Sequence, residues 1–509
     1  SHHPPQFMGR LLDEFPPPKY EDWRAEVVRL LKGAPFNRRM MTHTHEGITL
    51  QPMYRREDIN GLTHIASLPG CAPFLRGRKT LRNHGNAWDV AQEISYPIPD
   101  EFNRALKSDL DRGLTAVTLP LDRASRLGLD PDQAEVGQVG DGGVSISCMD
   151  DLTGALKGLD LIKVPVNVQC GSCGLPYLGL LIAGAMTGGV TLSGLRGAVA
   201  MDPFEELLMT GNLPMSFQDA FDEMAGMALW SVEHAPDLGT IWVHGEPFHD
   251  GGANAVQELA FALATGVVYL REMEKRGLAP EKIAPAVRFS FALGTNFFME
   301  ASKLRAARLL WYRILESCGV PEEGRVIWMH ARTSRYTLTL YDPHINILRA
   351  TTEALSGAIG GTDSLHVAPF DDHIRPANDF SRRIARNIQI IIKDEAQLTK
   401  VADPGGGSWY IEHLTNEIAK AAWSLFQTVE GMGGMAKAIE MGFPQKEVAR
   451  VAEQRAEVFA TRRDIIVGTN NYPNPNEAVL EKRPIDYRAI HAMRVNSICR
   501  MRISPPAPG

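Results

Sequence analysis

Residues Gly294–Trp311, GTNFFMEASKLRAARLLW, are the stretch that decides the fold. A turn at Gly294 leads into a segment whose apolar residues recur every three or four positions, as on one face of a helix. The cations Lys303, Arg305 and Arg308 stand between these apolar residues. The pattern predicts an amphipathic helix that packs on a sheet, within a barrel or a bundle. Its apolar residues are Phe297, Phe298, Ala301, Leu304, Ala307 and Leu310.

Short β-rich runs alternate with longer helical patterns along most of the chain. The clearest helical patterns between the runs are Phe217–Trp230, Ala255–Arg276 and Ile345–Ser356. Eight strands that alternate with helices favour a parallel (β/α)8 TIM barrel. An open doubly wound sheet is the alternative, because periodicity alone does not show that a sheet closes. The candidate strands are Thr115–Pro120, Val144–Ser147, Val164–Gln169, Ala198–Met201, Thr240–His244, Val287–Phe291, Val326–His330 and Leu365–Pro369.

Three regions are expected along the chain. Residues 1–60 are rich in proline and charge and contain one short predicted helix, so we expect an arm or wrapping segment there. Residues 61–400 form the barrel. Residues 401–509 form a helical extension followed by a linker and a tail. The predicted segments outside the barrel strands are the helices Tyr20–Leu31, Asp379–Glu395, Ser408–Gly431 and Gly434–Met441 and the linker Asn470–Asn476.

Composition narrows the class of protein. A net charge of −7 gives no basic surface for nucleic acid. Six cysteines in 509 residues indicate a reducing compartment, so we predict a cytoplasmic protein. The stretch between Lys163 and Arg196 is uncharged, but Asn167, Gln169 and Pro176 interrupt it. It divides into a strand and a helix of core length better than into a membrane span.

Two short motifs are better explained as turns than as catalytic or ligand-binding motifs. Cys170-Gly-Ser-Cys173 has redox spacing, but a second Cys/His pair at a zinc-binding spacing does not accompany it. Small residues also suit a tight turn at a barrel mouth. The glycine-rich run Gly137–Gly143 precedes a strand instead of leading from a strand into a helix, so it does not match a phosphate-binding loop.

Candidate site residues follow the predicted strands, where barrel enzymes keep their chemistry. His249 and Asp250 lie after the strand Thr240–His244, and His330 ends a later strand. Arg332 stands two residues further on. The spacing of these residues does not define a nucleophile and a base. The sequence pattern by itself therefore predicts only a cytosolic α/β barrel that binds a small molecule.

Several blocks resemble the methylmalonyl-CoA mutase family, which rearranges acyl-CoA carbon skeletons by radical chemistry with adenosylcobalamin. The resemblance covers roughly residues 20–471. It implies a TIM barrel with a CoA chain threaded along its axis past small and polar side chains. Besides Gly294–Trp311, the blocks are Pro52–Arg55, Gly70–Gly77, Ile384–Asn387, Asp403–Thr415 and Gly433–Glu440.

The resemblance also implies a second domain, which holds cobalamin through an Asp-x-His-x-x-Gly motif. This sequence contains no such motif. Any cobalamin would therefore be bound mainly by a partner chain or by a region outside this sequence.

The substrate pocket departs from the catalytic pattern of the family. The active-site tyrosine aligns with Asn83, and a Tyr-His pair aligns with Glu246-Pro247. Proline cannot act as an acid or donate a hydrogen bond. Thr210 stands where an arginine pairs with the substrate carboxylate, and Ala200 and Ala286 replace a glutamine and a further arginine.

Two pocket residues survive by alignment: His330 resembles a pocket histidine, and Glu353 resembles a glutamate that faces the adenosyl ribose. These two are the candidate catalytic residues. The candidate substrate-binding residues are Asn83, Thr210, His249, Asp250 and Arg332.

Arg82-Asn83, Ala87–Val90 and Asn346–Arg349 resemble the small subunit of heterodimeric mutases. That resemblance implies a largely structural barrel that pairs with a catalytic large subunit. A second hypothesis is the catalytic barrel of a split mutase, which acts on another acyl-CoA with a separate cobalamin-binding subunit. A third is a cobalamin-free protein that binds CoA esters.

Overall fold

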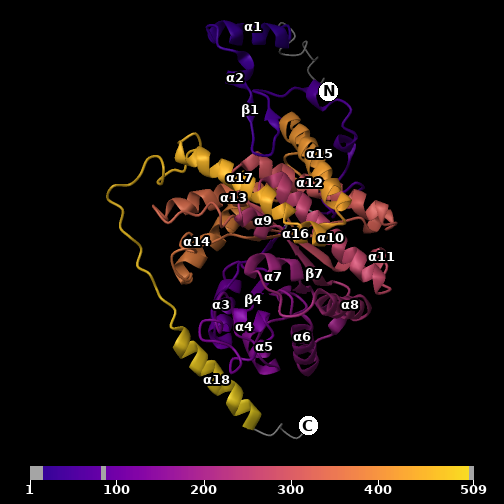
Figure 1. Cartoon of the computed structure of the whole chain (residues 1–509), viewed down its shortest axis with the longest axis vertical. Helices are drawn as coiled ribbons and strands as arrows, with labels where there is room; N and C mark the ends of the chain where they lie inside the picture. The colour runs from indigo at the N-terminus through magenta and orange to yellow at the C-terminus, as the bar shows by residue number, and fades with distance from the viewer. Residues whose placement is uncertain (1–14, 82–87, 504–509) are drawn as a thin grey trace, which may run out of the picture.

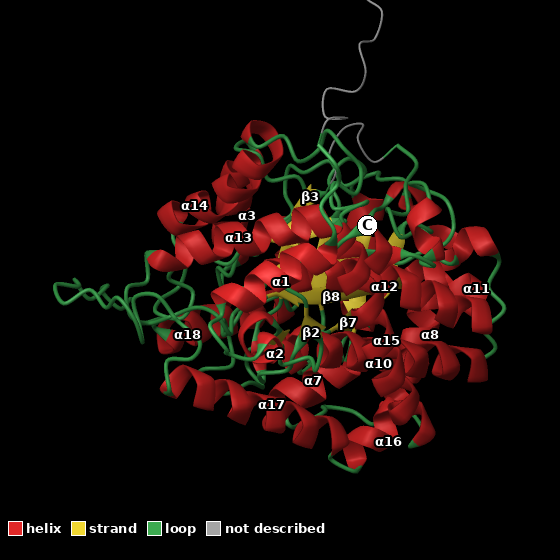
Figure 2. Ribbon diagram, turned by 90° about the horizontal axis from the view of Figure 1, so that it is seen from above, coloured by secondary structure: helices red, strands yellow, loops and turns green. Residues whose placement is uncertain are grey.

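The computed structural model describes residues 15–81 and 88–503. Eight parallel strands form one sheet in the order β3-β10-β9-β8-β7-β6-β5-β4. A parallel bridge between Glu93 and Thr118 joins its two ends, so the sheet closes into a barrel. Figure 2 shows the strands enclosed by helices. The strands are β3 (Asp89–Val90), β4 (Val117–Pro120), β5 (Val166–Gln169), β6 (Gly197–Met201), β7 (Leu238–His244), β8 (Val287–Leu293), β9 (Met329–Thr333) and β10 (Ser364–His366).

Helices follow the strands and cover the barrel (Figure 1). The chain belongs to the predicted (β/α)8 class, and the open-sheet alternative is wrong. The helices of the barrel region are α3 (Pro99–Leu110), α4 (Arg123–Arg126), α5 (Met149–Ala155), α6 (Leu175–Thr187), α7 (Pro203–Thr210), α8 (Phe217–His234), α9 (Glu246–Asp250), α10 (Ala255–Lys275), α11 (Pro280–Ile283), α12 (Phe297–Ser317), α13 (Ile345–Gly360) and α14 (Asp379–Ile390), which continues as a π-helical turn over Ile391–Glu395.

The termini add elements outside the barrel. All side chains of α1 are at least partly exposed, and this helix stands away from the barrel in Figure 1. At the other end, α18 docks beside α5, where Arg494 donates two hydrogen bonds to Asp151. The added elements are α1 (Tyr20–Leu30), α2 (Phe36–Met40), the hairpin β1 (Thr42–His43) and β2 (Thr49–Leu50), α15 (Trp409–Gly431), α16 (Met435–Glu440), α17 (Phe443–Ala460) and α18 (Tyr487–Ile503).

Two predicted strands need correction. Val144–Ser147 is not a strand, because only Val144 pairs with the sheet, through a bridge to Leu121. The eighth strand is instead β3, whose two residues are too few to show a period. The predicted Val326–His330 is displaced, since β9 begins at Met329.

The quoted helix is α12, but its predicted amphipathic character is wrong. Lys303 and Arg305 are fully buried, and Arg308 is 4% exposed. The helix lies between the barrel and α15, so its cations find partners inside the protein. Lys303 lies 2.5 Å from Glu258 and also contacts Glu300. Among residues 297–311 the exposed side chain is the apolar Phe298, which is 41% exposed.

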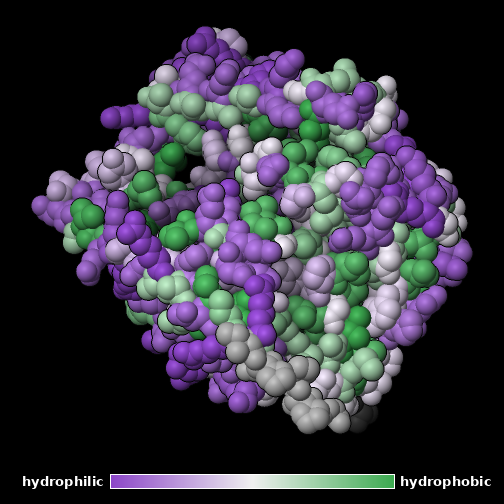
Figure 3. Space-filling view, turned by 60° about the horizontal axis from the view of Figure 1, so that its bottom comes forward, coloured by the Kyte–Doolittle hydropathy of each residue, from purple (hydrophilic) through white to green (hydrophobic). Residues whose placement is uncertain are grey.

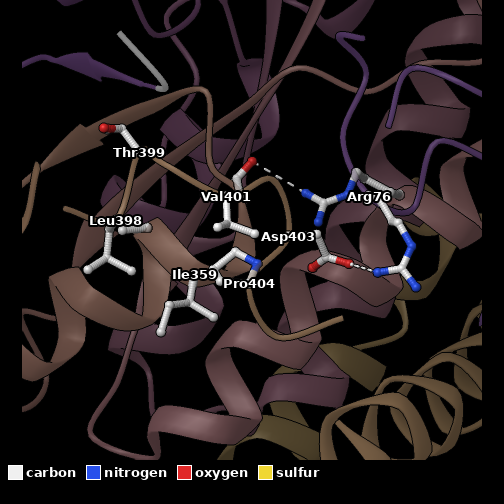
Figure 4. A pocket seen from close by; sticks show the side chains of 10 residues that line it. Arg76, Ile359, Leu398, Thr399, Val401, Asp403 and Pro404 are labelled. Carbon is white, nitrogen blue, oxygen red and sulfur yellow. Dashed lines mark hydrogen bonds and ion pairs between the residues drawn. The ribbon is translucent and has the colours of Figure 1, made fainter. Parts of the chain in front are cut away.

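A second buried ion cluster ties α12 to the C-terminal region. Arg305 donates to both oxygens of Asp403, at 2.9 Å each, and to Glu412 at 3.0 and 3.1 Å. Arg76 reaches the same Asp403 at 3.0 Å (Figure 4). The cavity beside this pair is only about 10 Å³, so we assign the cluster to the scaffold.

No helix within residues 15–81 and 88–503 combines the length and the apolar character that crossing a membrane requires.

Candidate functional site

A cavity of about 500 Å³ opens at the C-terminal ends of the barrel strands. β7 brings His244 to it, and β9 brings His330 and Arg332. The short helices α7 and α9, which follow β6 and β7, supply most of its carboxylates. The charged and histidine side chains that line it are Glu93, Arg123, Arg126, Asp141, Glu205, Glu206, His244, Glu246, Asp250, His330, Arg332 and Arg335.

Arg332 and Glu93 form the central ion pair of this lining. Nη1 of Arg332 donates to the two oxygens of Glu93 at 3.0 and 3.2 Å. Burial raises the pKa of Glu93, but the charges of Arg332, His366 and Arg335 outweigh burial and hold the pKa well below its usual range. Glu93 is therefore an anion at neutral pH.

The two histidines of the cavity carry different charges. Burial lowers the pKa of His330 to about 3, and its Nδ1 lies 2.9 Å from the Ser364 hydroxyl. Burial also lowers the pKa of His244, but Glu205 and Asp202 outweigh it and raise the value to about 9. At pH 7 His244 is a cation held by carboxylates, whereas His330 is neutral.

The axis of the barrel below this cavity is filled by tryptophan. Side chains alternate across a strand, so Trp242 points inward while Ile241 and Val243 join the main core outside the strands. Its ring lies 5.8 Å from that of Trp328 and 6.0 Å from that of His330. We call this cavity the cup, and the Trp242 ring beside its lining residue His330 its floor.

The structure brings four of the predicted site residues to this cup: Thr210, Asp250, His330 and Arg332. Thr210 is exposed at its rim, and its hydroxyl donates to the Glu206 carbonyl of its own helix at 2.7 Å. Burial raises the pKa of Asp250. Asn83 lies outside the described residues.

His249 and Glu353 lie outside the lining of the cup. His249 is buried, and its Nε2 lies 2.7 Å from the Ser334 hydroxyl. Glu353 accepts a hydrogen bond of 2.7 Å from Thr337, and burial raises its pKa to about 8. The two side chains belong to a buried polar network around Ser334.

Sequence reasoning did not propose Glu93, Arg126 or Glu205 for the site. Arg126 is held by Glu205 and Glu206 at 3.0 and 2.8 Å, and Glu205 also faces His244 at 3.8 Å. Their positions in the sequence could have indicated them, because each of these residues follows a strand within a few residues. Glu93 gave the weakest signal, since its strand was not predicted.

No three His, Cys, Asp or Glu side chains within residues 15–81 and 88–503 gather so that they could hold a metal ion. Glu353, which aligns with a residue that faces the adenosyl group, is turned to Thr337 instead.

A closed parallel barrel with a charged cup at the C-terminal ends of its strands is the architecture of small-molecule-binding (β/α)8 proteins. Within that class, the chain belongs to the methylmalonyl-CoA mutase family, whose model matches residues 43–505.

Three relatives illustrate the similarity. The methylmalonyl-CoA mutase of Rhizobium meliloti is 35% identical over 94% of this chain and 67% of its own length. The methylmalonyl-CoA mutase small subunit of Porphyromonas gingivalis is 36% identical over 93% of this chain and 72% of its own. The large subunit from the same organism is 33% identical over 90% and 64%. The chain thus spans about two thirds of the length of these relatives.

Proposed function

We propose that this chain is the non-catalytic small subunit of an adenosylcobalamin-dependent acyl-CoA mutase, paired with a catalytic large subunit. The observation that carries the proposal is the position of Trp242. Its side chain, with that of Trp328, occupies the axis along which a CoA chain would pass. A bulky aromatic floor and a threaded CoA chain cannot share this space.

The cup supports the same conclusion. Pro247 and Thr210 line it at the positions that align with catalytic residues of the family. Thr210 offers one hydroxyl, already bonded to backbone carbonyls, in place of a guanidinium that could pair with a carboxylate. The similarity to a named small subunit agrees with this assignment.

A split mutase is the second candidate, because the cup keeps a neutral His330 beside charged groups. In that case, adenosylcobalamin is bound by a separate, smaller subunit. The third candidate, a cobalamin-free protein that binds CoA esters, predicts no partner of either kind.

Purification of the chain from the cells that produce it distinguishes these candidates. We expect a partner of similar or larger size in native mass spectrometry, cobalamin absorbance in the complex, and acyl-CoA rearrangement by the complex but not by this chain alone. A partner of a single small domain, about 100–150 residues, would favour the split mutase.

His330→Ala in the complex provides the second readout. Turnover should be unchanged if the partner carries the chemistry, provided that the variant still assembles. Loss of turnover from an assembled complex would contradict the proposal, and so would rearrangement of any acyl-CoA by this chain with a cobalamin domain alone.

A further inference from the structure

Arg332 lines the cup, and one edge of its guanidinium has no hydrogen-bond partner among the described residues. Its Nη1 is bonded to Glu93, but Nε and Nη2 are buried and have no hydrogen-bond partner among the described residues. Nη2 lies 3.7 Å from the carboxylate of Asp372, which is too long for a hydrogen bond. Nε and Nη2 form the parallel pair of donors that suits a carboxylate.

Glu246 supplies an unpaired oxygen in the same lining. Its Oε1 accepts a hydrogen bond from the Ser290 hydroxyl, whereas Oε2 is buried without a partner in the part of the chain that is described. Burial raises the pKa of Glu246, against the opposing charges of His244 and Arg332. A hydroxyl group can pair with either form of this carboxyl, because a hydroxyl both donates and accepts.

Arg335 and Asp372 are two partly exposed side chains close to the Arg332–Glu93 pair. Arg335 is 40% exposed and Asp372 is 28% exposed, and they lie 3.7 Å apart. Arg335 lies 3.8 Å from Glu93. Contacts of this length between exposed groups are weak, so both side chains can move aside at little cost. An anion that replaces Asp372 beside Arg332 preserves the local charge balance.

The floor of the cup limits the size of what can bind. Trp242 lies on the axis beside His330, and the cup has a volume of about 500 Å³, which suits a small ligand.

We propose that the cup binds a small free hydroxycarboxylate. Its carboxylate takes the Nε–Nη2 edge of Arg332, and its hydroxyl pairs with Oε2 of Glu246. The inference rests on the proposed function, because a barrel that threaded an acyl-CoA would use the same space.

Isothermal titration calorimetry on the full-length chain, alone and in its complex, tests the inference with three probes. Glycolate carries both groups, acetate lacks the hydroxyl, and glycerol lacks the carboxylate. We expect glycolate to bind, acetate to bind several-fold more weakly, and glycerol to give no heat of binding. Equal binding of glycerol and glycolate would overturn the inference, as would no binding of any carboxylate.

Variants locate the site. Arg332→Gln should weaken glycolate binding by about tenfold or more, and Glu246→Ala should lower glycolate affinity to the level of acetate. Arg325→Gln removes a partly buried arginine that bonds Tyr312 and Glu316, so it serves as the matched control and should bind like the parent. Unchanged glycolate binding by folded Arg332→Gln would refute the assignment.

The two proposals fail in different ways. If this chain alone rearranges an acyl-CoA, the proposed function is wrong whatever glycolate does. If the complex forms with a catalytic partner but carboxylates do not bind to the cup, only the inference about the cup is wrong. If Arg332→Gln does not fold, the comparison of the three probes on the parent chain still tests whether the cup binds a hydroxycarboxylate.

Discussion

At the scale of single residues, the buried charges of α12 set the stability of the fold. Arg305 is fully buried between Asp403 and Glu412, which are also buried. Burial raises the pKa of Glu412, but hydrogen bonds from His64 and Arg305 outweigh it and lower the value to about 2. The cluster is stable only as a complete set, because each carboxylate needs its cation.

Replacing Arg305 therefore has a large effect. Arg305→Met leaves buried carboxylates without their main partner and should lower the free energy of unfolding by about 3–5 kcal/mol. Denaturant unfolding followed by circular dichroism measures this loss. Arg313→Met on the same helix is the control: Arg313 is 66% exposed, and its loss should cost less than about 1 kcal/mol. Equal effects of the two substitutions would contradict this account.

His244 gives the stability a dependence on pH. Its pKa is about 9 in the folded protein against an ordinary value of 6.5. A raised histidine pKa stabilises the fold fully below about pH 6.5, and the contribution, on the order of 3 kcal/mol, disappears as the pH rises through 9.

Unfolding free energies of the parent and His244→Gln at pH 6 and pH 9 test this. The parent should lose more stability over that interval than the variant. His234→Gln, an exposed histidine on α8, should behave like the parent. Parallel pH profiles for the parent and His244→Gln would show that His244 does not titrate as described.

At the scale of elements, α18 is held by one buried ion pair and by several more exposed contacts. The described residues between α17 and α18, 461–486, are mostly exposed, whereas Arg494 and Ile498 of α18 are buried, and Arg494 bonds Asp151 and Ser145. Arg502 is also paired, but it is 52% exposed.

Arg494→Ala should release α18 from α5, because the helix loses its buried ion pair. Limited proteolysis should then cut within 461–486 faster than in the parent, while the barrel remains intact. Arg502→Ala serves as the control and should change the cleavage rate much less. Cleavage at the parent rate in Arg494→Ala would show that other contacts hold α18.

Sequence patterns predicted the helices and strands well where apolar residues recur regularly. They failed to predict burial where a side chain depends on partners far away in the sequence. β7 and β8 are long apolar runs, so their positions were predictable. The burial of Lys303 and Arg305 was not, because their partners Glu258, Asp403 and Glu412 lie 45 to 107 residues away along the chain. The same holds for the cup, where Glu93 and Arg332 are 239 residues apart.

At the scale of the whole molecule, a partner chain has to bind to surfaces that stay exposed in this chain. The face in Figure 3 carries apolar patches within a largely hydrophilic surface. The exposed apolar side chains of the described residues include Tyr341, Leu348 and Tyr472. The arm predicted over residues 1–60 remains the clearest candidate contact, since all side chains of α1 and α2 are at least partly exposed.

Deleting residues 1–40 tests this role of the arm. The deletion leaves the β1–β2 hairpin, where Ile48 joins the core. We expect the unfolding transition of the isolated chain to be nearly unchanged, because little buried surface is lost. Binding to the large subunit, measured by analytical ultracentrifugation, should be lost or strongly weakened. Full assembly by the deletion variant would argue against a clasping arm.

The pairing of the first and last strands of the barrel has a consequence for the synthesis of the chain on the ribosome. β3 pairs with β10 through Asp89 and Ser364, 275 residues later in the chain. A ribosome adds roughly 5–20 residues per second, so the first strand waits about 15–55 seconds for its neighbour to be made. During that interval the nascent chain carries an open edge of sheet, which is prone to pairing with other chains. We therefore expect newly made copies of this protein to depend on chaperones more than the finished barrel does.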